Sequence, residues 1–241
     1  EAEEKYLNWI RQRAEHIPLQ QLTGEQGFMG LTFSVNEHVL IPRQDTEILV
    51  EEVLKELHDG MRVLDMCTGS GCILLSLLHY SNDCEGLGVD LSAEALEVAG
   101  RNVLKVLTPE KAEHAHFLQS DLFEKVEGKF EIIVSNPPYI ASAEVEKLMP
   151  EVRDHEPRMA LDGTEDGLYF YRRIIEKAGK HLVSSGMLFF EIGYDQGQAV
   201  SELMRTEGYC DVQVVQDYAG LDRVVFGTYV TVQPAPFAKS R

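Results

Sequence analysis

The chain has 241 residues, of which 44% are hydrophobic and 26% are charged, a composition typical of folded globular proteins. Its 40 acidic and 22 basic residues give a formal net charge of -18, which disfavours tight nonspecific binding to the phosphate backbone of nucleic acids. The longest apolar runs, such as 187–190, fall far short of the ~18 residues needed to cross a bilayer, which excludes a membrane-spanning protein.

The first part of the chain predicts two helices with a β-hairpin between them. Apolar residues at partly helical spacing favour a helix over 4–16, which ends before Pro18. Alternation of apolar with polar or small residues predicts a hairpin from about 26 to 41. Helical spacing returns over 46–57, which predicts the second helix.

From residue 61 onward, strands alternate with helices, the pattern of a mostly parallel sheet with helices on both faces. The last two β-rich runs are joined by 217–222, which is too short for a helical crossover, so these strands must pair antiparallel. Five parallel strands followed by an antiparallel hairpin are typical of the methyltransferase version of this α/β fold. The predicted strands are 62–66, 86–90, 115–119, 131–135, 187–192, 211–216 and 223–230.

The first candidate site is the turn after the first of these strands, where Gly69 and Gly71 precede an apolar helix. Glycines allow a ligand to approach the backbone, and N–H groups at the start of the helix can bind a carboxylate. Asp90 ends the next strand, at the separation where an acid meets ribose hydroxyls. Cys67 and Cys72 stand where two glycines of a G-x-G-x-x-G pattern would be, which disfavours a nicotinamide cofactor.

The most specific motif is Asn136-Pro137-Pro138-Tyr139, which directly follows a predicted strand and so lies at the sheet edge where ligands bind. The two prolines fix the loop and remove two backbone donors, which leaves carbonyl acceptors beside the Asn136 side-chain oxygen. Such a loop suits an NH2 group, because two hydrogen bonds would turn the nitrogen toward an electrophilic methyl.

Other chemistry is more weakly indicated. His114 and His116 would face the same side of a strand, but no carboxylate or thiol at ligand spacing accompanies them, so we expect no metal site. Glu191 ends a strand at the functional edge, and we favour a structural hydrogen bond there over a role as acid or base. The four cysteines lack C-x-x-C spacing and lie in apolar runs, so we expect structural thiols and a reducing cytoplasm.

The combined motifs resemble the HemK/PrmC-type protein-(glutamine-N5) methyltransferases, which methylate the Gln of the Gly-Gly-Gln motif in peptide-chain release factors. The resemblance covers nearly the whole chain. N-P-P-Y alone is shared with adenine methyltransferases, whereas its combination with I-P-R-x-x-T-E and E-P-x-x-A-L is much narrower. The resemblance implies a class I S-adenosylmethionine-dependent, Rossmann-like fold with a mostly parallel seven-stranded sheet. The matching segments are 24–30, 39–43 with 46–47, 65–71, 90, 120–121, 136–139, 156–157 with 160–161, 166–168, 191–193 with 196, and 217 with 220 and 222–223.

The resemblance also implies roles for residues of both motifs. Asn136 and the carbonyl of Pro137 would hold the substrate amide, and Pro138 and Tyr139 would shape its slot. We expect Asn136, Pro137 and Tyr139 to be the catalytic residues. The expected contacts to S-adenosylmethionine come from Cys67, Thr68, Gly69, Ser70, Gly71, Asp90, Asp121, Leu122 and Asn136.

Two positions depart from the family pattern. Cys67 stands where the family usually has the first glycine of the turn, and Gln44 replaces a proline. We expect ordinary backbone torsions at Cys67, so that cofactor binding is unaffected or weakened rather than lost. Most of the family's helical N-terminal domain is expected to be missing. We therefore predict a helix remnant and β-hairpin over 1–42 and a catalytic domain over 43–241.

The predicted function is methylation of the Gly-Gly-Gln glutamine of release factors by a cytoplasmic monomer that binds neither nucleic acid nor membrane. One alternative is a nucleic-acid adenine-N6 methyltransferase, which would use the same slot for a flipped base. The acidity and the absence of a recognisable target-recognition domain argue against it. The other alternative is a silent S-adenosylmethionine-binding module that lost turnover through Cys67, against which the intact N-P-P-Y and Asp90 argue.

Overall fold

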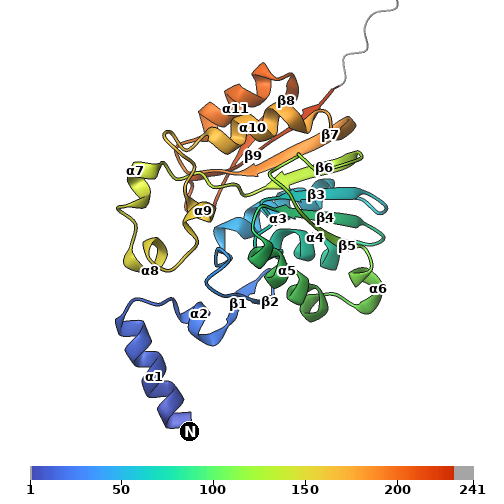
Figure 1. Cartoon of the computed structure of the whole chain (residues 1–241). Helices are drawn as coiled ribbons and strands as arrows, with labels where there is room; N and C mark the ends of the chain where they lie inside the picture. Colours follow the sequence, from blue (N-terminus) through green and yellow to red (C-terminus); the bar gives the residue numbers. More distant parts are fainter. Residues whose placement is uncertain (1, 231–241) are drawn as a thin grey trace, which may run out of the picture.

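The computed structural model describes residues 2–230. Residue 1 of the predicted domain 1–42 and residues 231–241 of the predicted domain 43–241 lie outside the described residues. The strands of the main sheet are β3 (Arg62–Met66), β4 (Glu85–Asp90), β5 (Ala115–Gln119), β6 (Phe130–Ser135), β7 (Leu182–Glu191), β8 (Tyr209–Gln216) and β9 (Asp222–Tyr229). They lie in the order β5-β4-β3-β6-β7-β9-β8 (Figure 1). The first five are parallel, whereas β9 is antiparallel to both β7 and β8, which confirms the predicted α/β topology.

Helices cover both faces of this sheet. They are α3 (Asp45–Glu56), α4 (Cys72–Tyr80) and α5 (Ala93–Val106) on one face, and α10 (Tyr169–Ala178) and α11 (Gly197–Thr206) on the other (Figure 1). Ile132 and Phe189 belong to the apolar cluster with α3 and α4, whereas the adjacent Ile133 and Phe190 belong to the cluster with α10 and α11. The two-residue period of the strands therefore divides the core into two layers.

The N-terminal part consists of α1 (Ala2–Ala14), α2 (Leu19–Thr23), β1 (Glu25–Phe28) and β2 (Leu31–Ser34). The prediction of a hairpin over 26–41 was wrong at its far end, because β2 ends at Ser34. Val35 and Val39 are buried, but they pack in an apolar cluster with Ala95 and Val98 of α5 instead of pairing in a strand. The chain after β2 therefore continues as a loop.

One buried side chain ties this hairpin to the main domain. Asn102 of α5 is fully buried, and its Oδ1 accepts a hydrogen bond from the Ser34 N–H at 2.7 Å. Its Nδ2 donates to the carbonyl oxygens of Ser34 and Ser70, at 3.0 and 2.9 Å. Since Ser70 lies in the glycine turn after β3, the hairpin and this turn share one anchor. The division of the chain near residue 42 remains a prediction.

Two further sequence predictions need correction. β7 begins at Leu182 rather than at residue 187, because Leu182 pairs with Phe130 before a shift in strand register. The expectation of buried thiols holds for Cys72 and Cys84, but Cys210 is exposed. Cys210 lies near the start of β8, an edge strand whose residues are mostly open to solvent, so its position in an apolar run did not bury it.

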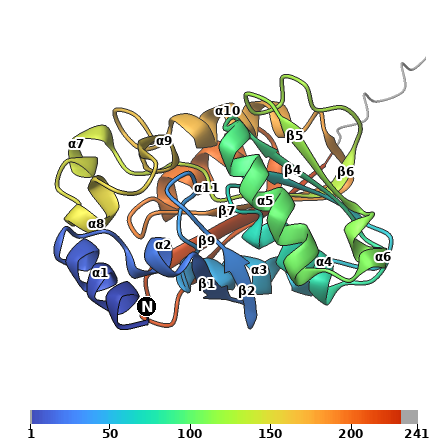
Figure 2. The ribbon, with the colours of Figure 1, turned by 60° about the horizontal axis from the view of Figure 1, so that its bottom comes forward.

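Three short helices lie between β6 and α10. They are α7 (Ser142–Val145), α8 (Pro150–Arg153) and α9 (Arg158–Leu161). Figures 1 and 2 place them together at one end of the molecule, with α8 near α1. An ion pair of 3.3 Å between Arg13 and Glu151 joins α1 to α8. Within the described residues, no helix has both the length and the apolar character required to cross a membrane.

Candidate functional site

A cavity of about 220 Å³ opens at the sheet edge where β3, β4 and β6 end. Most of the predicted site residues are brought together here, although they come from separate loops. Gly71 and Pro137 do not line this cavity, and Tyr139 instead lines a neighbouring one together with Gln196 and Arg223. The predicted residues that line the main cavity are Cys67, Thr68, Gly69, Ser70, Asp90, Asp121, Leu122, Asn136 and Pro138.

The glycine turn is held by a buried carboxylate. Asp65 of β3 is fully buried, and its Oδ2 accepts hydrogen bonds from the Thr68 hydroxyl at 2.6 Å and the Leu74 N–H at 3.3 Å. Gly71 precedes α4 with a φ of 78°, and a Cβ at this position would lie 3.2 Å from both Leu75 and Ala99. The turn therefore requires glycine at position 71 for both its backbone conformation and its packing.

Asp90 connects this turn to the end of β4. Its Oδ2 accepts a hydrogen bond from the Gly69 N–H at 2.9 Å, and its Oδ1 accepts one from the Ser92 N–H at 3.0 Å. Ser92 itself caps α5 by accepting from the Ala95 N–H. Burial raises the pKa of Asp90 against these hydrogen bonds. Because a carboxylate offers about four lone-pair sites, Asp90 keeps capacity for hydroxyl donors from the cavity.

Asp121 and Leu122 form the wall of the cavity next to Asp90. The Ser120 N–H donates to the Asp90 carbonyl, which fixes the start of this loop. The Asp121 carboxylate forms an ion pair of 3.0 Å with Arg173 of α10. Leu122 is buried with a φ of 48°, a left-handed conformation that is uncommon outside glycine. This wall of the cavity thus carries the apolar side chain of Leu122 next to the carboxylate of Asp121, which is paired with Arg173.

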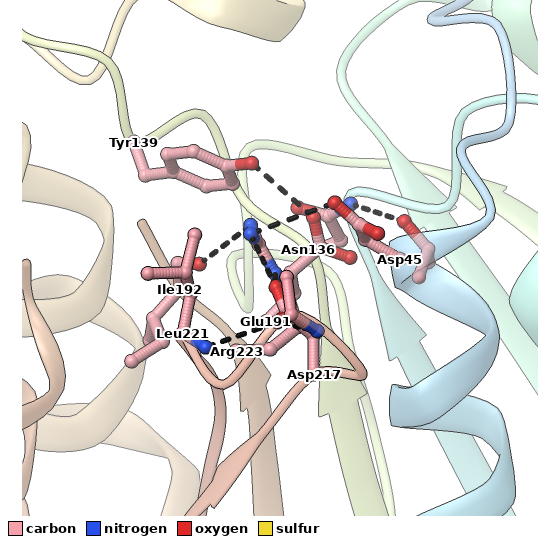
Figure 3. Close-up of polar contacts among 10 residues, drawn as sticks. Asp45, Asn136, Tyr139, Glu191, Ile192, Asp217, Leu221 and Arg223 are labelled. Atoms are coloured by element: carbon pink, nitrogen blue, oxygen red, sulfur yellow. Dashed lines mark hydrogen bonds and ion pairs between the residues drawn. The ribbon is translucent and has the colours of Figure 1, made fainter. Parts of the chain in front are cut away.

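The loop after β6 contacts a second buried carboxylate. The Tyr139 hydroxyl donates to Glu191 Oε1 at 3.2 Å (Figure 3). Asn136 Nδ2 donates to Thr46 Oγ1 over a long distance of 3.5 Å. Burial raises the pKa of Glu191, while hydrogen bonds from Thr46 and Tyr139 and the charge of Arg223 oppose that effect. The structural hydrogen bond favoured for Glu191 from the sequence is therefore present.

Sequence reasoning missed one wall of the cavity. Pro42, Arg43 and Thr46 line it from one side, and residues 157–162 contribute from another. The buried Glu156 joins these segments, because its carboxylate accepts from the Ile41 N–H at 3.0 Å and forms an ion pair with Arg43. The sequence feature that could have predicted this wall is the pair of motifs I-P-R-x-x-T-E and E-P-x-x-A-L. Both motifs supported the resemblance, but neither was assigned to the site.

The expected backbone conformation of Cys67 was wrong. Its φ is 64°, in the left-handed region that costs an ordinary residue about 1–2 kcal/mol. The turn forces this conformation, since Met66 is fixed in the core and the Thr68 N–H donates to the Val89 carbonyl. The backbone therefore favours the glycine that the resemblance implies at this position, and Cys67 occupies it under strain.

Comparison with known proteins supports the fold and identifies relatives. Residues 43–152 match the family described as the methyltransferase small domain. A release factor glutamine methyltransferase of Clostridium acetobutylicum is 44% identical, over 92% of this chain and 78% of that protein. A protein of the same name from Thermodesulfovibrio yellowstonii is 43% identical, over 90% of this chain and 78% of that protein. The crystal structure of a methyltransferase from Pyrococcus furiosus shares the fold, with a TM-score of 0.61, 17% identity, and coverage of 92% of this chain and 99% of that one.

The strain at Cys67 can be tested by comparing Cys67→Gly with Cys67→Ala. Both remove the thiol, but only glycine relieves the left-handed backbone, so we expect the glycine variant to be more stable by about 1 kcal/mol. Chemical denaturation measures this difference. At the exposed Cys210, in strand β8, the same pair should reverse, with alanine more stable by about 0.5–1 kcal/mol. Greater stability of Cys67→Ala would contradict the assigned conformation.

The buried Asp65 predicts a pH-dependent stability. Burial raises its pKa to about 7, from 3.8 in an unfolded chain, so the folded state holds an extra proton between these values. The stabilisation of the folded state by this proton is complete below pH 4 and is lost as the pH rises through about 7. Relative to Asp65→Asn, the free energy of unfolding of the wild type should therefore fall by up to about 4 kcal/mol over this range. Denaturation at pH 4.5 to 8 tests this, with the exposed Asp59→Asn as control, and a pH-independent difference would refute it.

Proposed function

Because the chain belongs to the release factor glutamine methyltransferase family, we propose that it methylates the side-chain amide nitrogen of a glutamine in peptide-chain release factors. S-adenosylmethionine is the proposed methyl donor. The observation that carries the proposal is the position of the Asn136 loop, which lines the same cavity as the glycine turn and Asp90. An acceptor for an amide NH2 group and a pocket suited to a nucleoside are thus adjacent.

The residues around the cavity fit this donor. Asp90 retains lone pairs for ribose hydroxyls, and Asp121 and Leu122 offer a polar and an apolar contact for an adenine. Gly69 has open space where a side chain would begin, so a ligand can approach the backbone of the turn. Thr68, Ser70, Gly71 and Cys67 complete the proposed binding segment. When bound, S-adenosylmethionine supplies a methyl group made electrophilic by the sulfonium.

The Asn136 loop has the role of orienting the glutamine. Asn136 Oδ1 and the Pro137 carbonyl would accept hydrogen bonds from the amide NH2 group and direct its nitrogen at the methyl carbon. Pro138 would limit the slot from the cavity side, and Tyr139 would support the loop through Glu191. No base is needed before the attack, since the amide proton can leave afterwards. The product on the release factor is N5-methylglutamine.

The proposal includes a cytoplasmic monomer that acts on the protein substrate without binding nucleic acid directly. The formal net charge of -18 supports this last point, because an acidic protein is repelled by a phosphate backbone. To test the function, the purified protein is incubated with methyl-labelled S-adenosylmethionine and separate pools of release factor, DNA and RNA. We expect label in the release factor alone, and none when the glutamine of its Gly-Gly-Gln motif is replaced by alanine. Label in DNA or RNA would overturn the proposal.

Asp90→Ala should weaken binding of S-adenosylmethionine by about 1.5–3 kcal/mol, the usual contribution of hydrogen bonds to a charged group. Isothermal titration calorimetry measures the affinity, and circular dichroism checks that the variant remains folded. The exposed Asp59→Ala is the matched control. An affinity of Asp90→Ala equal to that of the wild type would remove Asp90 from the binding site.

Asn136→Ala should slow methyl transfer by about 100-fold or more, with little change in binding of S-adenosylmethionine, because the lost acceptor matters most as the reacting atoms align. Single-turnover labelling of release factor measures the rate. The exposed Asn82→Ala serves as control. Asn136→Asp should also be slow, since its charge favours the sulfonium ground state and its carboxylate lacks the NH2 donor. A wild-type rate for Asn136→Ala would remove the amide slot from the mechanism.

A further inference from the structure

The proposed amide slot depends on where the backbone of the Asn136 loop points its carbonyl groups. Pro137 and Pro138 have no N–H, so the protein cannot hold their peptide units by accepting hydrogen bonds from them. The Pro137 carbonyl, which the proposed function uses as an acceptor, therefore takes its direction from the two ends of the loop. At the first end, Ser135 is fully buried as the last residue of β6. The other end, at Tyr139, requires an anchor of its own.

Gln196 supplies that anchor. It directly precedes α11, and its side-chain Nε2 donates to the Tyr139 carbonyl at 3.0 Å. Its Oε1 accepts from the Gly193 N–H at 2.9 Å, which closes the turn between β7 and α11. A backbone carbonyl can only accept a hydrogen bond and a backbone N–H can only donate one. These two partners therefore fix which end of the Gln196 amide faces the loop.

A second segment encloses the same end of the loop. The Ile140 N–H donates to the Leu161 carbonyl at 3.0 Å, and the Gly163 N–H donates to the Ile140 carbonyl at 2.8 Å. Gly167 approaches so closely that a side chain at its position would collide with the Tyr139 carbonyl. This end of the loop is therefore held from two sides.

Both polar groups of Tyr139 are thus engaged inside the protein. Its carbonyl accepts from Gln196, and its hydroxyl donates to Glu191 (Figure 3). Gln196 lines the neighbouring cavity and not the main one, so it acts through the loop rather than on the reacting atoms. We infer that Gln196 is a positioning residue that holds the Asn136 loop, and with it the Pro137 carbonyl, in place. The inference rests on the proposed function for its catalytic consequence, whereas the hydrogen bonds belong to the protein alone.

The two hydrogen bonds of Gln196 can be separated by substitution. Gln196→Glu keeps an oxygen for the Gly193 N–H but, once ionised, has no donor for the Tyr139 carbonyl. A negative charge is also favoured next to the start of a helix, so this variant should preserve the turn before α11. Gln196→Ala removes both hydrogen bonds. Gln198→Glu is the matched control, because it makes the same chemical change at an exposed position of α11.

Each variant is assayed for kcat and KM with purified release factor at about pH 8, where a glutamate is ionised. Affinity for S-adenosylmethionine and melting temperature are measured in parallel.

We expect Gln196→Glu and Gln196→Ala to lower kcat about 10-fold or more, with an affinity for S-adenosylmethionine within about twofold of the wild type, since the loop matters most as the reacting atoms align. Gln198→Glu should behave as the wild type. Wild-type activity of Gln196→Glu would overturn the inference even if Gln196→Ala is impaired, because only the turn before α11 would then matter. A loss confined to KM, or one explained by affinity for S-adenosylmethionine or by unfolding, would also overturn it.

Hydrogen exchange of backbone amides gives a second measurement, which is independent of methylation. NMR on 15N-labelled protein follows the amides of Ile140 and Gly163, which report on the end of the loop, and that of Gly193, which reports on the turn. In Gln196→Glu we expect the first two to exchange several-fold faster while Gly193 remains slow. In Gln196→Ala all three should accelerate.

The amides of β6 serve as the internal reference, because a loss of global stability would accelerate them as well. Unchanged exchange at Ile140 and Gly163 in Gln196→Glu would refute the positioning role. If the wild-type protein does not methylate release factor, the proposed function fails, and this measurement still decides whether Gln196 holds the loop.

Discussion

Buried carboxylates at the ends of parallel strands hold the functional edge of this protein together. Asp65, Asp90 and Glu191 lie at or next to the last residue of β3, β4 and β7. Removing a carboxylate from water is costly unless it receives hydrogen bonds, so the adjoining loops must bring donors to fixed places. These donors are Thr68 and Leu74 for Asp65, Gly69 and Ser92 for Asp90, and Tyr139 for Glu191. These hydrogen bonds thereby hold the glycine turn and the Asn136 loop each in a single conformation.

The same constraint extends to segments far from these strands in the sequence. Residues 35–44 have no regular strand or helix, yet they contribute a wall of the cavity. Their position is set by Glu156, which is buried and receives both the Ile41 N–H and the Arg43 guanidinium. Asn102 adds a second anchor through Ser34 and Ser70. A loop of this kind is ordered by side chains that satisfy buried polar groups rather than by its own backbone pairing.

This distribution of contacts explains what could be predicted from the sequence. The strands and the two motifs follow from local patterns, because hydrophobic period and glycine or proline positions are properties of short segments. Local patterns could not predict that the hairpin ends at Ser34. Val35 and Val39 alternate with polar residues as strand residues do, but they are buried against α5 rather than in a strand pair. The left-handed backbone at Cys67 depends on how the sheet holds Met66 and Thr68. A φ angle set by such contacts cannot be predicted from the sequence of the turn alone. The contacts Arg43–Glu156 and Asn136–Thr46 join distant positions, so no local pattern indicates them.

The polar groups of the site also differ in what they leave for a ligand. Burial raises the pKa of Tyr139, which keeps its hydroxyl protonated as a donor to Glu191 and unsuited to act as a base. Glu191 accepts this hydrogen bond in the interior, where it is removed from the cavity lining. Among the groups that line the cavity, Asn136 Oδ1 and the free lone pairs of Asp90 can accept hydrogen bonds from a ligand. In the proposed reaction the sulfonium is already a good leaving group, so the chemistry demands orientation rather than proton transfer. A site that keeps the Tyr139 hydroxyl bound to Glu191 and presents acceptor oxygens of Asn136 and Asp90 to the ligand meets that demand.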